Sequence, residues 1–153
     1  MRLWDFAAAV YARPAVRAAC LSLQDDHAQC VSLLLWRAWT VEEGRPIDAQ
    51  LLKDAMFAAR FWDDGVTSPL REARRRLAAV SPMVERQARL ALRGQVQVAE
   101  LEAERLLLAG LEKLSPAPGK AAGGLFPALL ALASDWTPGT PAQAVRVLAA
   151  TLA

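Results

Sequence analysis

The residues of this 153-residue chain that could do chemistry gather in one segment, which carries Arg71, Arg74, Arg75 and Arg76. If the segment is helical, Arg71 and Arg75 project from the same side with Arg74 beside them. Guanidinium groups placed in this way bind phosphate or carboxylate oxygens through paired hydrogen bonds. Trp62, at the end of the preceding predicted helix, would lie close enough to stack on a base or on an arginine. The candidate anion-binding residues are therefore Arg71, Arg74, Arg75 and Trp62.

The same arginines have a structural alternative, a solvated helix face held by intramolecular ion pairs. Glu72 lies one helical turn before Arg76, and Asp63 and Asp64 precede the segment. The chain carries 18 Lys and Arg against 16 Asp and Glu, a net charge of +2, which is too small to imply general binding of polyanions. Any anionic partner would therefore have to be held by a local patch.

Two pairs of adjacent carboxylates, Asp25-Asp26 and Asp63-Asp64, invite comparison with magnesium-dependent prenyl-transferring enzymes. Those enzymes need acidic clusters one helical turn apart on facing helices, whereas no further acid follows Asp26 within a turn. Aspartates at helix ends also cap the backbone and form turns. Capping and turn formation are the preferred interpretation of both pairs.

His27 and Cys30 are three residues apart, and Cys20 could lie near them, so a Cys/His/Cys metal site can be drawn. A structural zinc site needs four ligands, and the pattern offers no fourth. A Cys/His nucleophile would also need a third group to orient the base, which the spacing does not identify. We therefore predict no metal, no cofactor and no catalytic residue, and interpret the two cysteines as small core residues.

A second signal, which concerns partners, follows a long helix predicted over residues 82–114. A seam of mostly small residues repeats at spacings of four or three residues: Ala88, Leu92, Val96, Ala99, Ala103 and Leu106. Beside it runs a stripe that is basic first and acidic last: Arg86, Arg89, Arg93, Gln97, Glu100 and Glu104. Two such stripes place Arg opposite Glu when the helices pair antiparallel.

The predicted self-association face combines the two patterns. It comprises Arg86, Arg89, Arg93, Val96, Ala99, Glu100, Ala103 and Glu104. The alternative is that the seam packs on the other helices of the same chain and the charges are solvated.

These residues must be positioned by helices, because 54% of the chain is hydrophobic and apolar residues recur at helical spacing. The predicted helices cover residues 3–12, 14–24, 27–43, 49–62, 69–80 and 82–114. Asp26 caps the third helix, Asp48 caps the fourth, and Asp63-Asp64-Gly65 turns the chain after it. The third helix is apolar nearly all round, so it belongs in the centre of the domain.

The chain divides at a stretch rich in Pro, Gly and Ala over residues 115–124, which is typical of a flexible linker. It separates a helical domain, residues 1–114, from a helical C-terminal tail, residues 125–153, that folds back onto the domain or onto a partner. The predicted fold is all-α, an irregular helical bundle of five short helices plus one long helix and the helical tail. The predicted core contains Trp4, Phe6, Leu23, Leu34, Leu35, Trp39, Leu52, Trp62, Leu70 and Leu77.

Local motifs follow one another over residues 1–115: Leu3-Trp4-Asp5-Phe6, Val10-Tyr11-Ala12-Arg13-Pro14, Ala19-Cys20-Leu21-Ser22-Leu23-Gln24-Asp25, Leu33-Leu34-Leu35 with Trp39, and Pro69-Leu70-Arg71 with Arg74-Arg75. Together they resemble a family of small helical proteobacterial proteins known only as a domain of unknown function. The family pattern usually has a Gly and an Asn near the start of the third helix, where this chain has Ala28 and Ser32. The resemblance implies the helical fold and a cytoplasmic location, and it implies no activity.

The location can also be argued from the residues. Two cysteines are too few for a disulfide framework, and Asp5 interrupts what would be the apolar region of a secretory signal. The longest apolar stretches, residues 31–36 and 125–133, are much shorter than the roughly 20 residues that span a bilayer. We therefore expect a cytoplasmic protein without a membrane partner.

The sequence favours a non-enzymatic protein interaction or adaptor module, with a homodimer as one form of it. Its apolar surface is in excess and its catalytic groups are not assembled. The alternative function is an anion- or nucleic-acid-binding module that uses the face of Arg71, Arg74 and Arg75.

Overall fold

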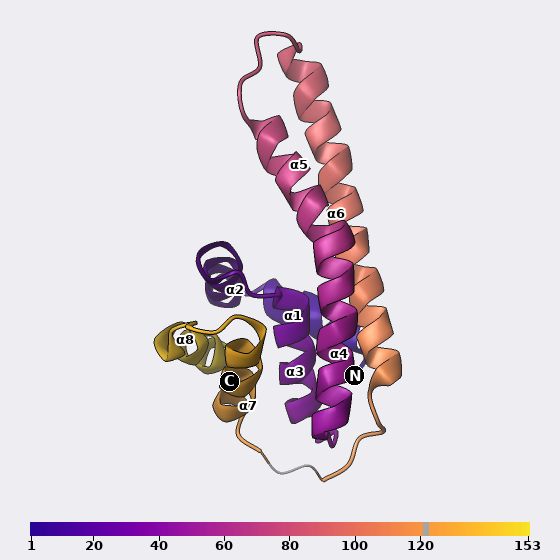
Figure 1. The fold of residues 1–153 in the computed structure, drawn as a ribbon, viewed down its shortest axis with the longest axis vertical. Helices are drawn as coiled ribbons and strands as arrows, with labels where there is room; N and C mark the ends of the chain where they lie inside the picture. The colour runs from indigo at the N-terminus through magenta and orange to yellow at the C-terminus, as the bar shows by residue number, and fades with distance from the viewer. Residues whose placement is uncertain (121–122) are drawn as a thin grey trace.

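The computed structural model describes residues 1–120 and 123–153, and every regular element in these ranges is helical (Figure 1). The α-helices are α1 (Leu3–Tyr11), α2 (Pro14–His27), α3 (Val31–Glu42), α4 (Ala49–Trp62), α5 (Ser68–Ala78), α6 (Arg86–Leu114), α7 (Leu125–Trp136) and α8 (Ala142–Leu152). A π-helical turn, η1 (Asp63–Thr67), joins α4 to α5. The predicted all-α fold is confirmed.

The junction between α2 and α3 differs from the prediction. α2 continues through Asp26 to His27, and the carboxylate of Asp26 accepts a hydrogen bond from the Ser22 hydroxyl, 3.2 Å away. The helix ends at Ala28, whose φ of 52° lies in the left-handed region that favours glycine. The predicted cap at Asp26 is therefore wrong, and Cys30 occupies the cap position of α3 without a side-chain hydrogen bond.

α4 and α5 form one long arm rather than two helices separated by a tight turn (Figure 1). The predicted cap of α4 is confirmed, because the Leu51 N–H donates to the carboxylate of Asp48 at 2.8 Å. The predicted turn over residues 63–65 is wrong, since these residues belong to η1. Within this stretch the Ser68 hydroxyl donates to the carboxylate of Asp63 at 3.1 Å, so Asp63 is engaged locally while the backbone stays helical.

α5 and the N-terminal half of α6 form a hairpin that projects from the rest of the molecule (Figure 1). α6 begins at Arg86, later than predicted, because the Glu85 carboxylate caps it by accepting hydrogen bonds from the N–H groups of Gln87 and Ala88 at 2.8 and 2.7 Å. The C-terminal half of α6 packs on the body, where Leu111 is buried. The protruding half of this long helix is thus the N-terminal one (Figure 1).

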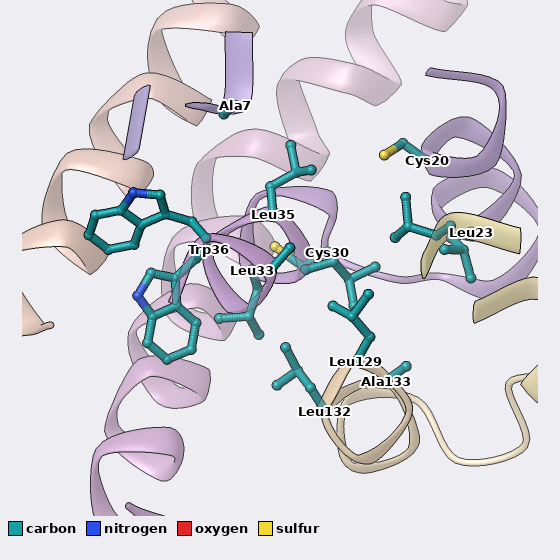
Figure 2. Packing of buried hydrophobic residues seen from close by; sticks show 14 of the residues in the cluster. Ala7, Cys20, Leu23, Cys30, Leu33, Leu35, Trp36, Leu129, Leu132 and Ala133 are labelled. Atoms are coloured by element: carbon teal, nitrogen blue, oxygen red, sulfur yellow. The ribbon is translucent and has the colours of Figure 1, made fainter. Parts of the chain in front are cut away.

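α3 lies in the centre of the body, as its apolar pattern predicts (Figure 2). Helices α1, α2, α4, α6 and α7 all pack on it. Trp36 and Trp39 are fully buried, and their indole N–H groups donate to the Ser115 hydroxyl at 2.8 Å and to the Met1 carbonyl at 2.9 Å. The polar atoms of the two largest core side chains are therefore satisfied.

The C-terminal tail is part of the same core. α7 packs on α3, and α8 packs on α2 and on α7. Leu129, Leu132 and Leu148 are buried to 1% exposure or less, and Figure 2 shows Leu129 and Leu132 beside the residues of α3. The Trp136 indole also donates to the carbonyl of Ala28 at 3.1 Å. The tail therefore completes the domain that precedes it, an outcome that the sequence left open.

The predicted linker over residues 115–124 is held at several points along its described part. The Gly119 N–H donates to the Gly44 carbonyl at 3.1 Å, and the Arg45 guanidinium donates to the Pro116 carbonyl at 2.6 Å. Residues 121–122 lie outside the described ranges. The start of this segment is thus anchored to the end of α3.

Half of the predicted core residues are buried, namely Phe6, Leu23, Leu34, Leu35 and Trp39. Trp4, Leu52 and Trp62 are half-buried and pack against the core from outside. Leu70 and Leu77 are also half-buried, but they lie on α5, which packs mainly on α6 and contributes no residue to the central cluster. For these two residues the predicted core position is wrong, because α5 belongs to the projecting hairpin.

Candidate functional site

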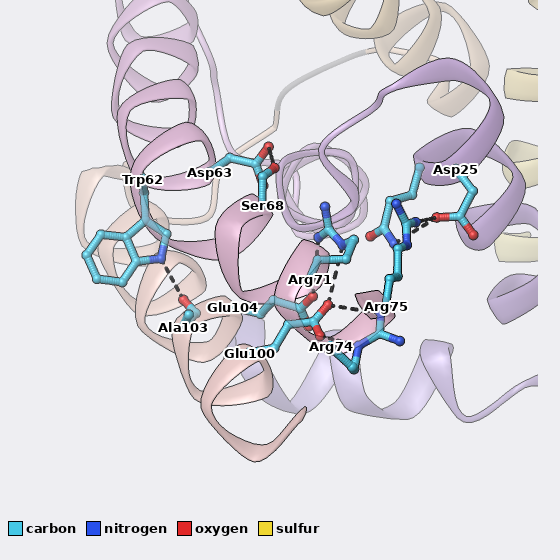
Figure 3. A network of polar contacts seen from close by, with 11 residues as sticks. Asp25, Trp62, Asp63, Ser68, Arg71, Arg74, Arg75, Glu100, Ala103 and Glu104 are labelled. Carbon is cyan, nitrogen blue, oxygen red and sulfur yellow. Dashed lines mark hydrogen bonds and ion pairs between the residues drawn. The ribbon is translucent and has the colours of Figure 1, made fainter. Parts of the chain in front are cut away.

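The arginines of α5 face the acidic part of α6, where they form a polar network (Figure 3). Glu100 accepts from the Nε atom of Arg74 at 2.5 Å and lies 3.3 Å from the Nε atom of Arg71. The side chains of Arg71 and Glu100 are only 12% and 9% exposed. A buried carboxylate is therefore shared between two guanidinium groups, an arrangement that holds the hairpin together.

The remaining arginines of the segment are also paired. Arg75 donates to the carboxylate of Asp25 on α2 at 2.6 Å, and Arg76 donates to Glu72 one turn earlier at 2.9 Å. The indole N–H of Trp62 donates to the carbonyl of Ala103 at 2.8 Å, so this side chain is held against α6. The structure brings Arg71 and Arg74 together, as predicted, but it engages their guanidinium groups with carboxylates of the same chain.

The predicted self-association face is largely internal to the hairpin. Arg89, Glu100 and Ala103 are buried, and the Arg89 guanidinium donates to the Leu77 carbonyl of α5 at 2.7 Å. Arg93, Val96 and Glu104 are half-buried, and only Arg86 and Ala99 of the eight residues are exposed. Much of this face therefore packs within the chain, as the alternative interpretation predicted, because α5 lies along it.

Two hollows adjoin between the N-terminal helices and α6, and we call them together the cleft. The inner hollow, about 350 Å³, is mostly apolar and lies between α1, α3 and α6, with Trp4, Leu35 and Leu108 among its walls. The outer hollow, about 580 Å³, lies between α2 and the hairpin. The residues that line both are Tyr11, Arg17, Gln24, Leu101 and Glu104. A cleft of this size is large enough for a small organic ligand.

Glu104 is the carboxylate at the junction of the two hollows. Its closest cation is Arg71, whose NH2 atom lies 3.9 Å away, which is too far for a hydrogen bond. Among the described residues no donor forms a hydrogen bond with this carboxylate. Burial, with Glu100 and Asp63 nearby, raises the pKa of Glu104 to about 7, although Arg71 and Arg74 act in the opposite direction. The side chain is 33% exposed, so a ligand in the cleft can reach it.

The two cysteines are buried, and Asp25, Asp26 and Asp63 form contacts within the chain. Burial raises the pKa of Cys20 and of Cys30 to about 12, so neither thiol is activated as a nucleophile. In the described part of the chain, no three His, Cys, Asp or Glu side chains converge on a point that could hold a metal ion. Burial also raises the pKa of Asp63, which is bonded to Ser68 within its own segment.

An exposed apolar groove between α4 and α6 was not foreseen from the sequence. Phe57 and Phe61 are each 75% exposed and lie one helical turn apart on α4. With Leu106, Gly110 and Leu114 of α6 they line a groove of about 340 Å³. We call this the α4–α6 face. The signal for it was present, since both phenylalanines fall outside the inward stripe of the fourth predicted helix.

Within residues 1–120 and 123–153, none of the helices combines the length and the hydropathy needed to cross a membrane.

A family model described as "Protein of unknown function (DUF2390)" matches residues 2–111. The chain belongs to this family. The match extends from α1 into the last turn of α6, so it includes the hairpin, the cleft and most of the α4–α6 face, and α7 and α8 lie beyond it. The resemblance inferred from the motifs is thereby confirmed. No curated protein and no solved structure matches the chain.

Proposed function

We propose that this DUF2390 chain is a helical interaction module that binds a second copy of itself through the α4–α6 face. The observation that carries the proposal is the pair Phe57 and Phe61, each 75% exposed on the rim of an apolar groove. Large contiguous apolar patches are rare on monomeric proteins, and aromatic side chains are enriched in the centres of interfaces.

The α4–α6 face suits a second copy because it offers both protruding rings and a hollow. Gly110 contributes no side chain to the groove, and a Cβ atom added there would meet no other atom within 4 Å. A two-fold axis through the face would place the phenyl rings of each copy against the groove of the other. The same ring-to-groove contact would then form twice, once from each copy.

The proposed role is non-enzymatic and cytoplasmic. The pKa values of Cys20 and Cys30, raised to about 12, support a role for the cysteines in packing rather than in catalysis. Both thiols are unpaired in the structure, which suits a reducing compartment. Self-association through the α4–α6 face does not depend on a non-enzymatic role or on a cytoplasmic location.

Light scattering after size-exclusion chromatography tests the proposal. The parent protein should elute with a mass of about twice 16.6 kDa. Phe57→Asp with Phe61→Asp should give the monomer mass, because two carboxylates cannot be buried in an apolar contact. Val147→Asp is the matched control, since Val147 is an exposed apolar residue of α8, away from this face. A parent that stays monomeric up to about 1 mM would overturn the proposal.

The predicted self-association face on α6 leads to a different expected result. If α6 pairs antiparallel along its small-residue seam, Val96→Asp should dissociate the dimer while the double phenylalanine variant leaves it intact. The reverse pattern is expected here, because the seam is partly covered by α5. A dimer that dissociates only with Val96→Asp would show that the interface is the seam of α6 and not the α4–α6 face.

The alternative function, binding of nucleic acid by Arg71, Arg74 and Arg75, would require the ligand to replace carboxylates that these groups already hold. We therefore regard it as second to self-association. Mobility-shift titrations with DNA and RNA at two salt concentrations test it, because each neutralised phosphate makes binding more sensitive to salt. A salt-sensitive shift that Arg71→Ala with Arg75→Ala abolishes would favour this alternative.

A further inference from the structure

The cleft is built around small side chains of α1 and of the residue that follows it. Ala7, Ala8 and Ala12 line the inner hollow where larger residues would fill it. Opposite them lie Leu35 of α3 and Leu108 of α6, both buried. The result is an apolar recess of about 350 Å³, which is within the range of pockets that bind small organic molecules.

Polar groups meet this recess at one end. Tyr11, Arg17, Gln24 and Glu104 line both the inner and the outer hollow. Glu104 is the carboxylate to which no described residue donates a hydrogen bond, and its closest cation, Arg71, is 3.9 Å away. A ligand that donates hydrogen bonds would supply what this group lacks.

We propose that the cleft binds an amphipathic organic cation, a primary amine on an aryl or alkyl body. Its ammonium group would donate to the carboxylate of Glu104, and its apolar body would lie in the inner hollow beside Trp4 and Leu35.

The charges around the junction favour a cation over an anion. Arg71 and Arg74 lie beside Glu100 and Glu104, so two positive charges face two carboxylates and offer an anion little net positive charge. Arg17 stands over the Tyr11 ring, 5.7 Å from its centroid, but its side chain is exposed and its field is screened by water. An anionic ligand would instead place its charge beside two carboxylates.

Binding should depend on pH in a defined direction. The pKa of Glu104 is raised to about 7, whereas an alkylamine stays protonated well above this pH. Ionisation of Glu104 should therefore make amine binding about tenfold tighter at pH 8 than at pH 6. The ionisable groups that act on Glu104 or line the cleft around it are Tyr11 of α1, Arg17 of α2, Cys30 of α3, Asp63 of η1, Arg71 and Arg74 of α5, and Glu100 of α6.

Calorimetric titration with three matched probes tests the proposal: 2-phenylethylamine, the anion 3-phenylpropionate and the neutral 2-phenylethanol. The amine should bind at least about tenfold more tightly than the other two, because only the amine can form an ion pair with Glu104. Preference for the anion, equal affinity for all three probes, or no binding of the amine up to about 10 mM would each overturn the proposal.

Variants locate the binding site. Glu104→Gln should weaken amine binding about tenfold or more and remove its pH dependence. Ala8→Trp should block the inner hollow, whereas Ala9→Trp, on an exposed neighbour that does not line it, should bind as the parent does. Amine binding that survives both Glu104→Gln and Ala8→Trp would place the ligand elsewhere and refute the assignment.

This inference is independent of the proposed self-association, because the cleft and the α4–α6 face share none of the residues that the tests alter. Phe57→Asp with Phe61→Asp should leave amine affinity unchanged. Failure of either proposal can therefore be recognised without reference to the other.

Discussion

Replacing Glu104 by glutamine should make the protein more stable at pH 8 and change its stability little at pH 5. The pKa of this carboxyl is raised from 4.5 to about 7 in the folded chain. Between pH 4.5 and about pH 7 the folded state binds more protons than the unfolded state. The free energy of unfolding therefore falls as the pH rises through this range. Glutamine resembles the protonated side chain and removes this loss.

The size of the effect follows from the pKa difference. At about 1.4 kcal/mol per pH unit, the difference corresponds to at most about 3 kcal/mol at pH 8. Because the side chain is 33% exposed, solvent screening reduces this value, and we expect a gain of about 1 to 2 kcal/mol for Glu104→Gln. Arg71 lowers the pKa of Glu104, but burial raises it by more, so the pKa remains above its usual value.

Urea unfolding followed by circular dichroism at pH 5 and pH 8 measures this gain. With a slope of about 2 kcal/mol per molar urea, the midpoint of the variant at pH 8 should lie roughly 0.5 to 1 M above that of the parent. Glu102→Gln is the matched control on the same helix, since Glu102 is exposed and Arg105 lowers its pKa. A variant no more stable than the parent at pH 8 would show that Arg71 outweighs burial at Glu104.

Further measurements test the fold. Leu129→Ala should destabilise the protein by about 2 to 5 kcal/mol in urea unfolding, because its side chain is fully buried, while Val147→Ala on the exposed side of α8 should cost less than about 0.5 kcal/mol; equal effects would contradict a tail packed into the core. Ala28→Gly should stabilise by about 0.5 to 1 kcal/mol and raise the melting temperature, because φ is 52° at this position, and a lower melting temperature would refute this. Cys20 and Cys30 should react with a disulfide reagent at pH 8 far more slowly in the native protein than in urea, since burial raises both pKa values to about 12; similar rates would mean that the thiols are accessible.

Local pattern predicted the features that depend on neighbours in the chain. The apolar residues of α3, present on nearly every side, placed that helix in the centre, and Asp48 was identified as a cap from its position alone. The junction at Ala28 was not predicted from local pattern. The backbone there turns left-handed without a glycine to signal it, so α2 was predicted to end too early.

The partners of charged side chains were decided by tertiary structure. Arg74 and Glu100 are 26 residues apart, and Arg75 and Asp25 are 50 apart, so spacing could show that the arginines share a face but not what covers that face. The hairpin of α5 and α6 brings Arg74 to Glu100, the approach of α5 to α2 brings Arg75 to Asp25, and the N-terminal helices cover part of Glu104. Helical periodicity is a short-range property that a single segment reveals, whereas the pairing, burial and pKa of a charged group depend on which distant helix packs against it.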